Sequence, residues 1–432
     1  MASDTVYGMR LDPISPADGF AVLRNRNVSF YLVARFLGTI AVQMMSVAVG
    51  WQIYALTHSL FDLGLIGLAQ FAPFLVLILW AGHVADSHDR RVIVMLCMAV
   101  QLLCNLGLMA LTWSDTGAVW PVFAVLVLYG SARAFMMPAQ QAVLRNLVPD
   151  QVFARAVALN SSTMTVARIL GPVLGGLLYG FGANVVYLLS SVMLAVSVLL
   201  MAGTCSAGRA SVKGPMSWHT LLEGLHFVRS RPVVLGAISL DLFAVLFGGA
   251  TALLPAYAHD VLHAGPSSLG LLRTAPGAGA ALGSIALAIW PVQRRVGAWM
   301  FGGVAVFGLA TIVMGLTASF MVALAALFLL GLGDSVSVYI RHLLVQYETP
   351  DAIRGRVSAV NAVFIGASNE LGEFESGLTA SWLGLVRAIV IGGVATLCVT
   401  AAWIRLFPVL SRMDRFPHHA SEADHVTSID KP

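Results

Sequence analysis

The sequence PDQVFARAVALN at residues 149–160 returns as PDAIRGRVSAVN at residues 350–361. The two copies are 201 residues apart, and they share a Pro-Asp pair, an arginine and an asparagine at matching positions. The same offset pairs Gly130 with Gly331 and Gly176-Leu177 with Gly377-Leu378. Apolar coincidences are common in a hydrophobic chain, but a polar pattern at one offset is not. The chain is therefore built from two related halves.

The composition of both halves indicates a membrane protein. Of the 432 residues, 58% are hydrophobic and only 11% are charged, whereas about a quarter of a soluble protein is charged. Several runs reach the ~20 apolar residues that a spanning helix needs, and they are continuous rather than alternating, which excludes a β-barrel. The polar segment Met1–Asn27 has no features of a cleaved signal, so we expect the first spanning helix to direct insertion.

The apolar runs predict an all-α membrane protein with twelve transmembrane helices in two six-helix bundles. The expected organisation is an N-terminal segment (1–27), a first bundle (28–204), a linker with a short amphipathic helix (205–232), a second bundle (233–410) and a tail (411–432). The spans are expected at Val28–Leu56, Leu63–Val84, Val92–Trp113, Ala118–Gln140, Val157–Phe181, Val185–Thr204, Val233–Ala256, Leu269–Trp290, Ala298–Thr317, Phe320–Tyr339, Ser358–Ala380 and Leu385–Leu406.

Positive charge predicts the orientation of these spans. Most of the 25 Lys and Arg fall in the N-terminal segment, the tail and every second loop, whereas the opposite loops hold Arg387 alone. The positive-inside rule then places both termini in the cytoplasm. Both copies of the repeated sequence lie in cytoplasmic loops, so the halves are parallel repeats about an axis along the membrane normal. In that architecture the substrate binds near mid-membrane between the two bundles.

The first cytoplasmic loop contains a small residue, an acid at a helix end and two arginines: Gly82, Asp86, Arg90 and Arg91. Such a group can hold two helices together through a charge–dipole contact and close helix crossing. An ordinary positive-inside loop is the plain alternative.

This loop resembles the Gly-x-x-x-Asp-x-x-x-Arg-Arg motif of the major facilitator superfamily, with Asp89 where the family usually has glycine. Residues 130–139 and 368–377 are similar to the drug:proton antiporter branch that contains the enterobactin exporter and macrolide efflux proteins. Gly171, Pro172, Gly175 and Gly176 resemble the antiporter motif Gly-Pro-x-x-Gly-Gly of that superfamily, which implies export. From the residues alone, the same stretch indicates a helix bend and close packing.

Acids inside the membrane are the main candidates for proton coupling, because intramembrane charge is costly and usually functional. The eleventh span holds Glu370, Glu373 and Glu375. Clustered carboxylates repel in a low dielectric, which favours a proton on one of them, as a proton carrier needs. Pairing with arginines in a purely structural role is an equal alternative.

Two further charges, Arg133 and Asp334, correspond at the 201-residue offset. They could form a pair between the bundles in one state, or each could have a local partner. Arg133 also matches a place where the superfamily's exporters often carry a functional arginine. Other polar residues within spans are candidates for the substrate cavity, with helix–helix hydrogen bonding as the alternative: Arg35, Gln43, Gln52, Arg168, Asp241 and Arg273.

The sequence gives no indication of a cofactor, a metal centre or an enzyme. Neither Lys213 nor Lys431 follows a glycine, so no P-loop is present and transport must draw on a gradient. His259 and His263 have metal-ligand spacing but only Asp260 beside them, and the four cysteines show no metal spacing.

These features predict a monomeric secondary transporter of the inner membrane that exports a small molecule, such as a siderophore, macrolide or other drug, in exchange for protons. Its partners would be substrate, proton and membrane lipid, with no nucleic acid. Uptake or lipid flipping by the same fold remains open, and so does a membrane-embedded sensor or enzyme.

Overall fold

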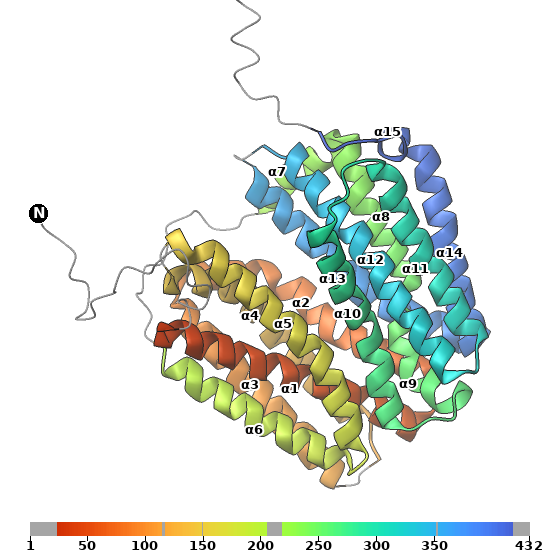
Figure 1. Ribbon diagram of the computed structural model, residues 1–432. Helices are drawn as coiled ribbons and strands as arrows, with labels where there is room; N and C mark the ends of the chain where they lie inside the picture. Colours follow the sequence, from red (N-terminus) through yellow and green to blue (C-terminus); the bar gives the residue numbers. More distant parts are fainter. Residues whose placement is uncertain (1–23, 115–116, 149, 205–217, 351–352, 418–432) are drawn as a thin grey trace, which may run out of the picture.

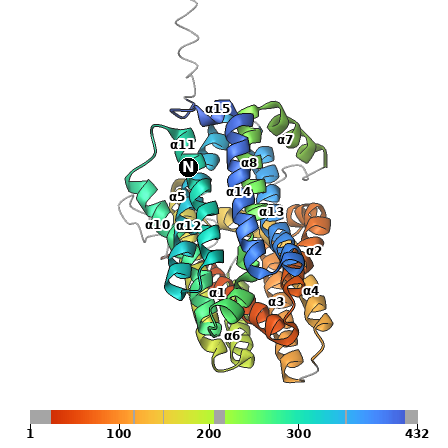
Figure 2. The same ribbon diagram turned by 90° about the vertical axis from the view of Figure 1, so that its right-hand side faces the viewer.

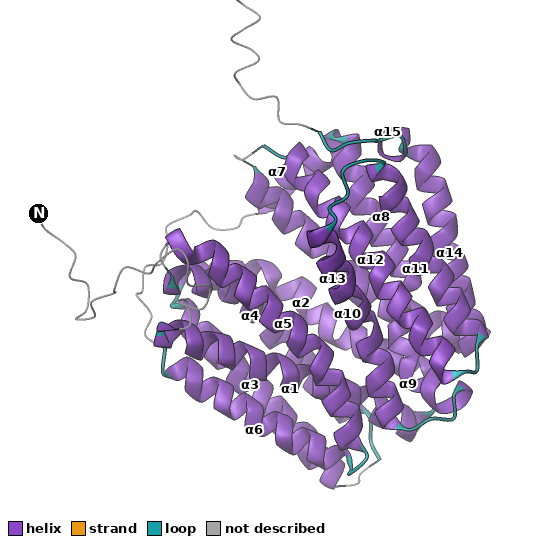
Figure 3. Ribbon diagram, in the orientation of Figure 1, coloured by secondary structure: helices purple, strands orange, loops and turns teal. Residues whose placement is uncertain are grey.

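The computed structural model describes residues 24–114, 117–148, 150–204, 218–350 and 353–417. Within these ranges the chain is helical and contains no strand (Figure 3). The first half forms α1 (Arg26–Thr57), α2 (Leu60–Ser87), α3 (Arg90–Trp113), α4 (Trp120–Leu147), α5 (Asp150–Tyr179) and α6 (Ala183–Ala202).

The second half follows α7 (Trp218–Ser230), a short helix within the residues assigned to the linker. It comprises α8 (Pro232–Gly248), η2 (Ala250–Leu253), α9 (Leu254–Ala256), η3 (Tyr257–Val261), α10 (Pro266–Ile289), α11 (Val296–Leu316), α12 (Phe320–Glu348), α13 (Arg354–Leu383), α14 (Leu385–Leu406) and α15 (Pro408–Ser411).

By length and composition, the described residues form ten segments that are apolar enough to cross a membrane. Two further helices, α5 and α13, have 30 residues each and are long enough to cross but are more polar. They occupy equivalent positions in the two halves, and both contain residues that the sequence identifies as functional candidates. The polarity of these two helices therefore coincides with the expected position of the transport site.

One expected span is interrupted. The sequence predicts a continuous helix over Val233–Ala256, but α8 ends at Gly248 and is followed by a 3-10 turn and a π turn. A Cβ on Gly249 would lie 2.6 Å from the carbonyl carbon of Gly372 in α13, so a larger residue cannot occupy this position. Pro255, which lacks an amide N–H, lies in the first turn of α9. The Tyr257 hydroxyl donates to the carbonyl oxygens of Met314 (2.6 Å) and Thr317 (2.8 Å), which anchors the irregular segment.

The helices form two bundles, α1–α6 and α8–α14, with the beginning of α7 at the end of the molecule that also holds α15 (Figure 1). We call this the basic end, because it includes the Arg90-Arg91 turn, and we call the other the opposite end. The bundles converge at the opposite end, near α9, and diverge towards the basic end (Figure 1).

Two seams join the bundles, one between α2 and α13 and the other between α5 and α10. They lie on different sides of the molecule (Figure 2). In the first seam a Cβ on Gly64 would lie 3.0 Å from the Cα of Gly377, and in the second a Cβ on Gly176 would lie 2.7 Å from the Cα of Gly270. Glycine permits this backbone-to-backbone packing between membrane helices. Both glycine contacts lie in the halves of the helices nearer the opposite end.

Candidate transport site

An ion pair joins the two bundles at mid-helix. Arg133 in α4 donates from Nη1 to Oε1 of Glu370 in α13 at 2.5 Å. The Glu370 side chain is 13% exposed and the Arg133 side chain 42% exposed, so the arginine keeps part of its surface free. A charged hydrogen bond between elements that must move apart during transport can act as a lock between them.

Glu373 lies beside this pair on the same face of α13, one helical turn further on. It is within electrostatic reach of Glu370, Arg133 and Arg273. Its Oε2 would be 3.0 Å from a Cβ on Gly67 of α2, so it occupies the seam itself. Arg273 of α10 donates from Nη1 to the Ser46 hydroxyl of α1 at 2.8 Å, which forms a second polar contact between the bundles.

Glu375 is not part of this group. It accepts a hydrogen bond from Thr379 one turn along its own helix at 2.8 Å. Two residues beyond Glu373, it points about 200° around the helix axis. The structure thus separates one of the three acids that the sequence grouped together.

In this structure Arg133 and Asp334 do not pair with each other and each has another partner, and a pair between them in a different state stays a prediction. Asp334 is 3.6 Å from Arg341, and Asp241 of α8 is 2.7 Å from the same guanidinium group. Arg341 is 6% exposed and Asp241 14% exposed. Asp241, a candidate for the substrate cavity, forms a buried ion pair inside the second bundle, which is the helix–helix alternative given for it.

Arg341 is a central residue that the sequence reasoning did not single out. Its position seven residues after Asp334 puts both on one face of α12, two turns apart. The seven-residue spacing between Asp334 and Arg341 was the feature of the sequence that could have identified this contact.

Arg35 and Arg168 lie in the first bundle together with Arg133. Arg35 donates from Nη1 to Oδ1 of Asn160 in α5 at 3.2 Å and to the Tyr31 hydroxyl at 3.4 Å. Arg168 is exposed, and it is within electrostatic reach of both Arg35 and Arg133. Among the described residues, Arg168 has no hydrogen-bond or ion-pair partner.

Two glutamines that are candidates for the cavity make contacts between helices. Gln52 donates to Thr112 at 2.9 Å and accepts from Tyr187 at 2.7 Å, and Tyr187 is fully buried in the first bundle. The Gln43 side chain packs against Gly171, where a Cβ would lie 2.5 Å from the Cβ of Gln43. These contacts agree with the helix–helix alternative given for both residues, and a cavity role for either stays a prediction.

The glycine-proline motif of α5 packs on two neighbours. Gly171 and Gly175 face α1, where a Cβ on Gly175 would lie 2.9 Å from the Cα of Met44. Gly176 and the carbonyl of Pro172 face Gly270 of α10. The motif therefore contributes both to the packing of its own bundle and to the seam.

The two arginines of the basic loop bind helix C-termini. Arg90 donates from Nε to the Ala85 carbonyl at 3.2 Å, and Arg91 donates from Nε to the Met201 carbonyl of α6 at 3.1 Å. Cations are favoured at helix C-termini by the helix dipole. Gly82 is buried in α2, and the side chain of Asp86 lies outside the described residues.

At the opposite end, aromatic and acidic side chains connect α1 to the irregular segment η3. The Tyr54 hydroxyl donates to Asp260, which also pairs with His259 at 2.7 Å. The ring of Trp51 lies 5.9 Å from that of His259. The described residues contain no group of three metal-ligating side chains, and His259 is engaged with Asp260.

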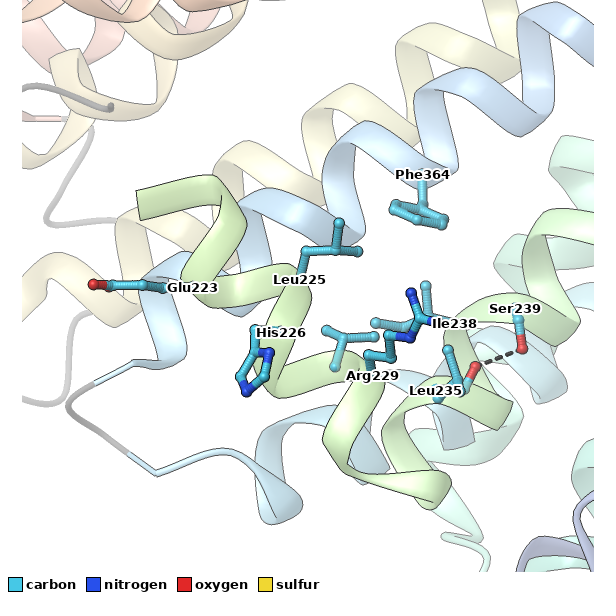
Figure 4. Close-up of a pocket in the computed structure, with 9 residues that line it drawn as sticks. Glu223, Leu225, His226, Arg229, Leu235, Ile238, Ser239 and Phe364 are labelled. Carbon is cyan, nitrogen blue, oxygen red and sulfur yellow. Dashed lines mark hydrogen bonds between the residues drawn. The ribbon is translucent and has the colours of Figure 1, made fainter. Parts of the chain in front are cut away.

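A separate cavity of about 780 Å³ lies between α7, α8 and α13 (Figure 4). Its walls are mainly apolar, and Glu223, His226, Arg229 and Ser239 add polar groups. The residues that line it include none of the site residues expected from the sequence. The cavity therefore lies apart from the Arg133–Glu370 pair.

The sequence and the fold both match known transporters. Residues 17–429 match the family model described as "Transmembrane secretion effector". The enterobactin exporter EntS of Citrobacter koseri is 25% identical over 76% of this chain and 79% of its own length, and that of Shigella boydii is 24% identical over 82% and 88%.

Two solved structures show the same fold. A bacterial homologue of the human lysosomal transporter Spinster has a TM-score of 0.71 and 15% identity, and it covers 90% of this chain and 97% of its own. The nucleoside transporter NupG has a TM-score of 0.71 and 12% identity, and it covers 89% and 99%.

The major facilitator fold is thus confirmed, with ten apolar spans and the two more polar helices α5 and α13 within the described residues, and the protein is a multi-pass membrane transporter of the bacterial inner-membrane type rather than an enzyme. The chain belongs to the transmembrane secretion effector family of the major facilitator superfamily.

Proposed function

We propose that this transporter exports a small amphipathic molecule, such as a siderophore or macrolide, in exchange for protons. The observation that carries the proposal is the Arg133–Glu370 ion pair across the bundles. A proton on Glu370 would remove the negative charge that holds Arg133, so protonation and separation of the bundles would be coupled. Glu373, in electrostatic contact with the pair, is the second proton carrier.

The direction of transport is supported by two features. The first is the glycine-proline motif, which packs α5 against α10 at the opposite end. The second is similarity to exporters of enterobactin. With both termini in the cytoplasm, the basic end faces inward, and the bundles are joined on the outer side. This arrangement leaves the transporter ready to receive cargo from the cytoplasm.

The proton gradient is sufficient for this work. Moving one charge across 100 mV releases about 2.3 kcal/mol, which supports a concentration ratio of roughly 50-fold per proton. No ATP-binding motif is needed.

Proteoliposomes test the proposal. Purified protein is reconstituted, and transport of enterobactin and erythromycin is followed together with the internal pH. We expect substrate-dependent proton movement in the wild type and its loss in Glu370→Gln and Glu373→Gln. Glu375→Gln is the matched control, since it removes a carboxyl of the same helix outside the cluster. Flux that does not change with a pH gradient would refute proton coupling. Normal transport by both Glu370→Gln and Glu373→Gln would exclude α13 as the proton relay.

Uptake or lipid flipping is distinguished by sidedness. Export predicts that expression lowers the cellular content of the compound and that deletion traps it inside. Accumulation on expression would indicate uptake, and movement of a labelled lysophospholipid between leaflets would indicate flipping. A sensor or enzyme would move none of these compounds.

A further inference from the structure

The membrane-embedded part of the first bundle carries positive charge without negative charge. Arg35, Arg133 and Arg168 come from α1, α4 and α5, and electrostatic interactions connect Arg168 to the other two. The six helices of this bundle contain no Asp or Glu except within their first or last three residues. The bundle therefore cannot neutralise its own arginines.

Each of the three arginines retains capacity to bind an acceptor. Arg168 is exposed and has no hydrogen-bond or ion-pair partner among the described residues. Arg35 interacts with the neutral groups Asn160 and Tyr31, and its Nε has no acceptor within the described part of the chain. Arg133 is 42% exposed while it binds Glu370. Guanidinium groups bind carboxylates and similar anions through paired, charged hydrogen bonds.

Like charges held close together in a low dielectric repel, and they persist where another charge compensates them. The first bundle supplies no such charge, and across the interface Glu370 and Glu373 reach Arg133 but do not act on Arg168. We infer that the cargo is an organic anion whose acidic group binds Arg168 and Arg35 and competes with Glu370 for Arg133. The inference rests on the proposed transport function and narrows its substrate to an anion, so a cationic macrolide such as erythromycin would not be cargo.

The competition gives cargo binding a mechanical effect. An anion on Arg133 replaces the carboxylate of the second bundle with a group that belongs to neither bundle. Glu373, which interacts with both Glu370 and Arg273, keeps the acids of α13 in electrostatic contact with a cation of their own bundle. Cargo would therefore release the lock between the bundles by ion exchange, without a covalent step.

Equilibrium binding to the purified full-length protein tests the anion site. Two matched pairs of probes differ only in charge: salicylate with salicylamide, and 2-naphthoate with 2-naphthamide. Binding is read from the rise in melting temperature, since a ligand that binds the folded state stabilises it. We expect both carboxylates to bind at least tenfold more tightly than their amides.

Each variant is expected to change carboxylate binding in a stated direction. Arg168→Gln should weaken carboxylate binding about tenfold, and Arg168→Lys should recover most of it. Arg405→Gln, which removes an exposed arginine at the end of α14, should have no effect. Glu370→Gln should tighten carboxylate binding, because the neutral amide no longer competes for Arg133. If Arg168→Gln does not fold, Arg168→Lys and Glu370→Gln still decide the question.

Three results would overturn the anion site: equal shifts for acids and amides, no shift with either acid, or weaker carboxylate binding in Glu370→Gln. No gradient is present in this assay, so its outcome is independent of direction and of proton coupling. Intact carboxylate binding with pH-insensitive flux would refute the proton coupling and leave the anion site standing. Proton-coupled flux of a neutral compound without carboxylate binding would refute the anion site and leave the proton coupling standing.

Discussion

Arg133 and Glu370 are 237 residues apart in the chain and 2.5 Å apart in space. They belong to different bundles and meet at mid-helix, next to the α2–α13 seam. The pair therefore reports directly on how the two halves are arranged.

We expect charge reversal at Arg133 to open the α2–α13 seam and double reversal to close it again. Arg133→Glu sets two acids against each other, whereas Arg133→Glu with Glu370→Arg restores opposite charges. Seam closure is measured by cross-linking Phe61→Cys to Phe374→Cys, whose native rings lie 6.1 Å apart, after the four native cysteines are replaced by alanine. Equal cross-linking in the single and double variants would contradict a role for the pair in closure.

Filling the α5–α10 glycine contact should abolish transport without unfolding the protein. A Cβ on Gly176 would lie 2.7 Å from the Cα of Gly270, so Gly176→Val forces the helices apart. We expect a loss of flux of at least tenfold in proteoliposomes with a normal elution profile. Gly302→Ala is the control, because nothing lies within 4 Å of a Cβ at that position. Normal flux in Gly176→Val would show that this close contact is dispensable.

Removing the Tyr54 hydroxyl should loosen the opposite end. Tyr54 donates to Asp260 across the bundles, and the loss of such a hydrogen bond costs about 1 kcal/mol. Tyr54→Phe should therefore increase thiol labelling of Trp51→Cys roughly fivefold from the outer side. Tyr339→Phe, inside the second bundle, should leave labelling unchanged. A rise in both variants would point to general loosening instead.

The Asp241–Arg341 pair should contribute to stability rather than to transport specificity. Arg341→Gln leaves Asp241 buried without its cation, and breaking a buried pair typically costs 3–5 kcal/mol. We expect a clear fall in melting temperature in detergent. Asp241→Asn with Arg341→Gln should recover much of the loss, because the buried Asp241 charge is removed together with its cation and the remaining Asp334 side chain is 39% exposed. A double variant as unstable as the single would exclude charge burial as the cause.

Much of the fold could be predicted because each helix must satisfy its backbone internally within lipid. The apolar run Leu385–Leu406 coincides with α14 at both ends. The interruption after Gly248 was missed, although Gly249 and Pro255 were visible signals of a break. A break in an apolar span is decided by what packs against it, here Gly372 of α13, and hydropathy carries no information about that.

The site was harder to predict because partners depend on how two separately folded bundles meet. The sequence identified Arg133 and Glu370 individually, and through the repeat it offered either a pair between Arg133 and Asp334 or a separate local partner for each. The repeat relates positions that are equivalent, which does not make them neighbours. Asp334 instead meets Arg341 on its own helix. The proton-coupling roles of the α13 acids stay predictions until transport is measured.

Among the residues that the structure describes, the ion pair has no counterpart at the α5–α10 seam. At the 201-residue offset, Arg133 corresponds to Asp334 and Glu370 corresponds to Ile169. The equivalent region near the α5–α10 seam offers a hydrogen bond from Thr274 to the Ile169 carbonyl, at 3.1 Å. Ionic strength and membrane voltage will therefore act mainly on one flank. Such perturbations should separate the two bundles more along the α2–α13 seam than along the α5–α10 seam.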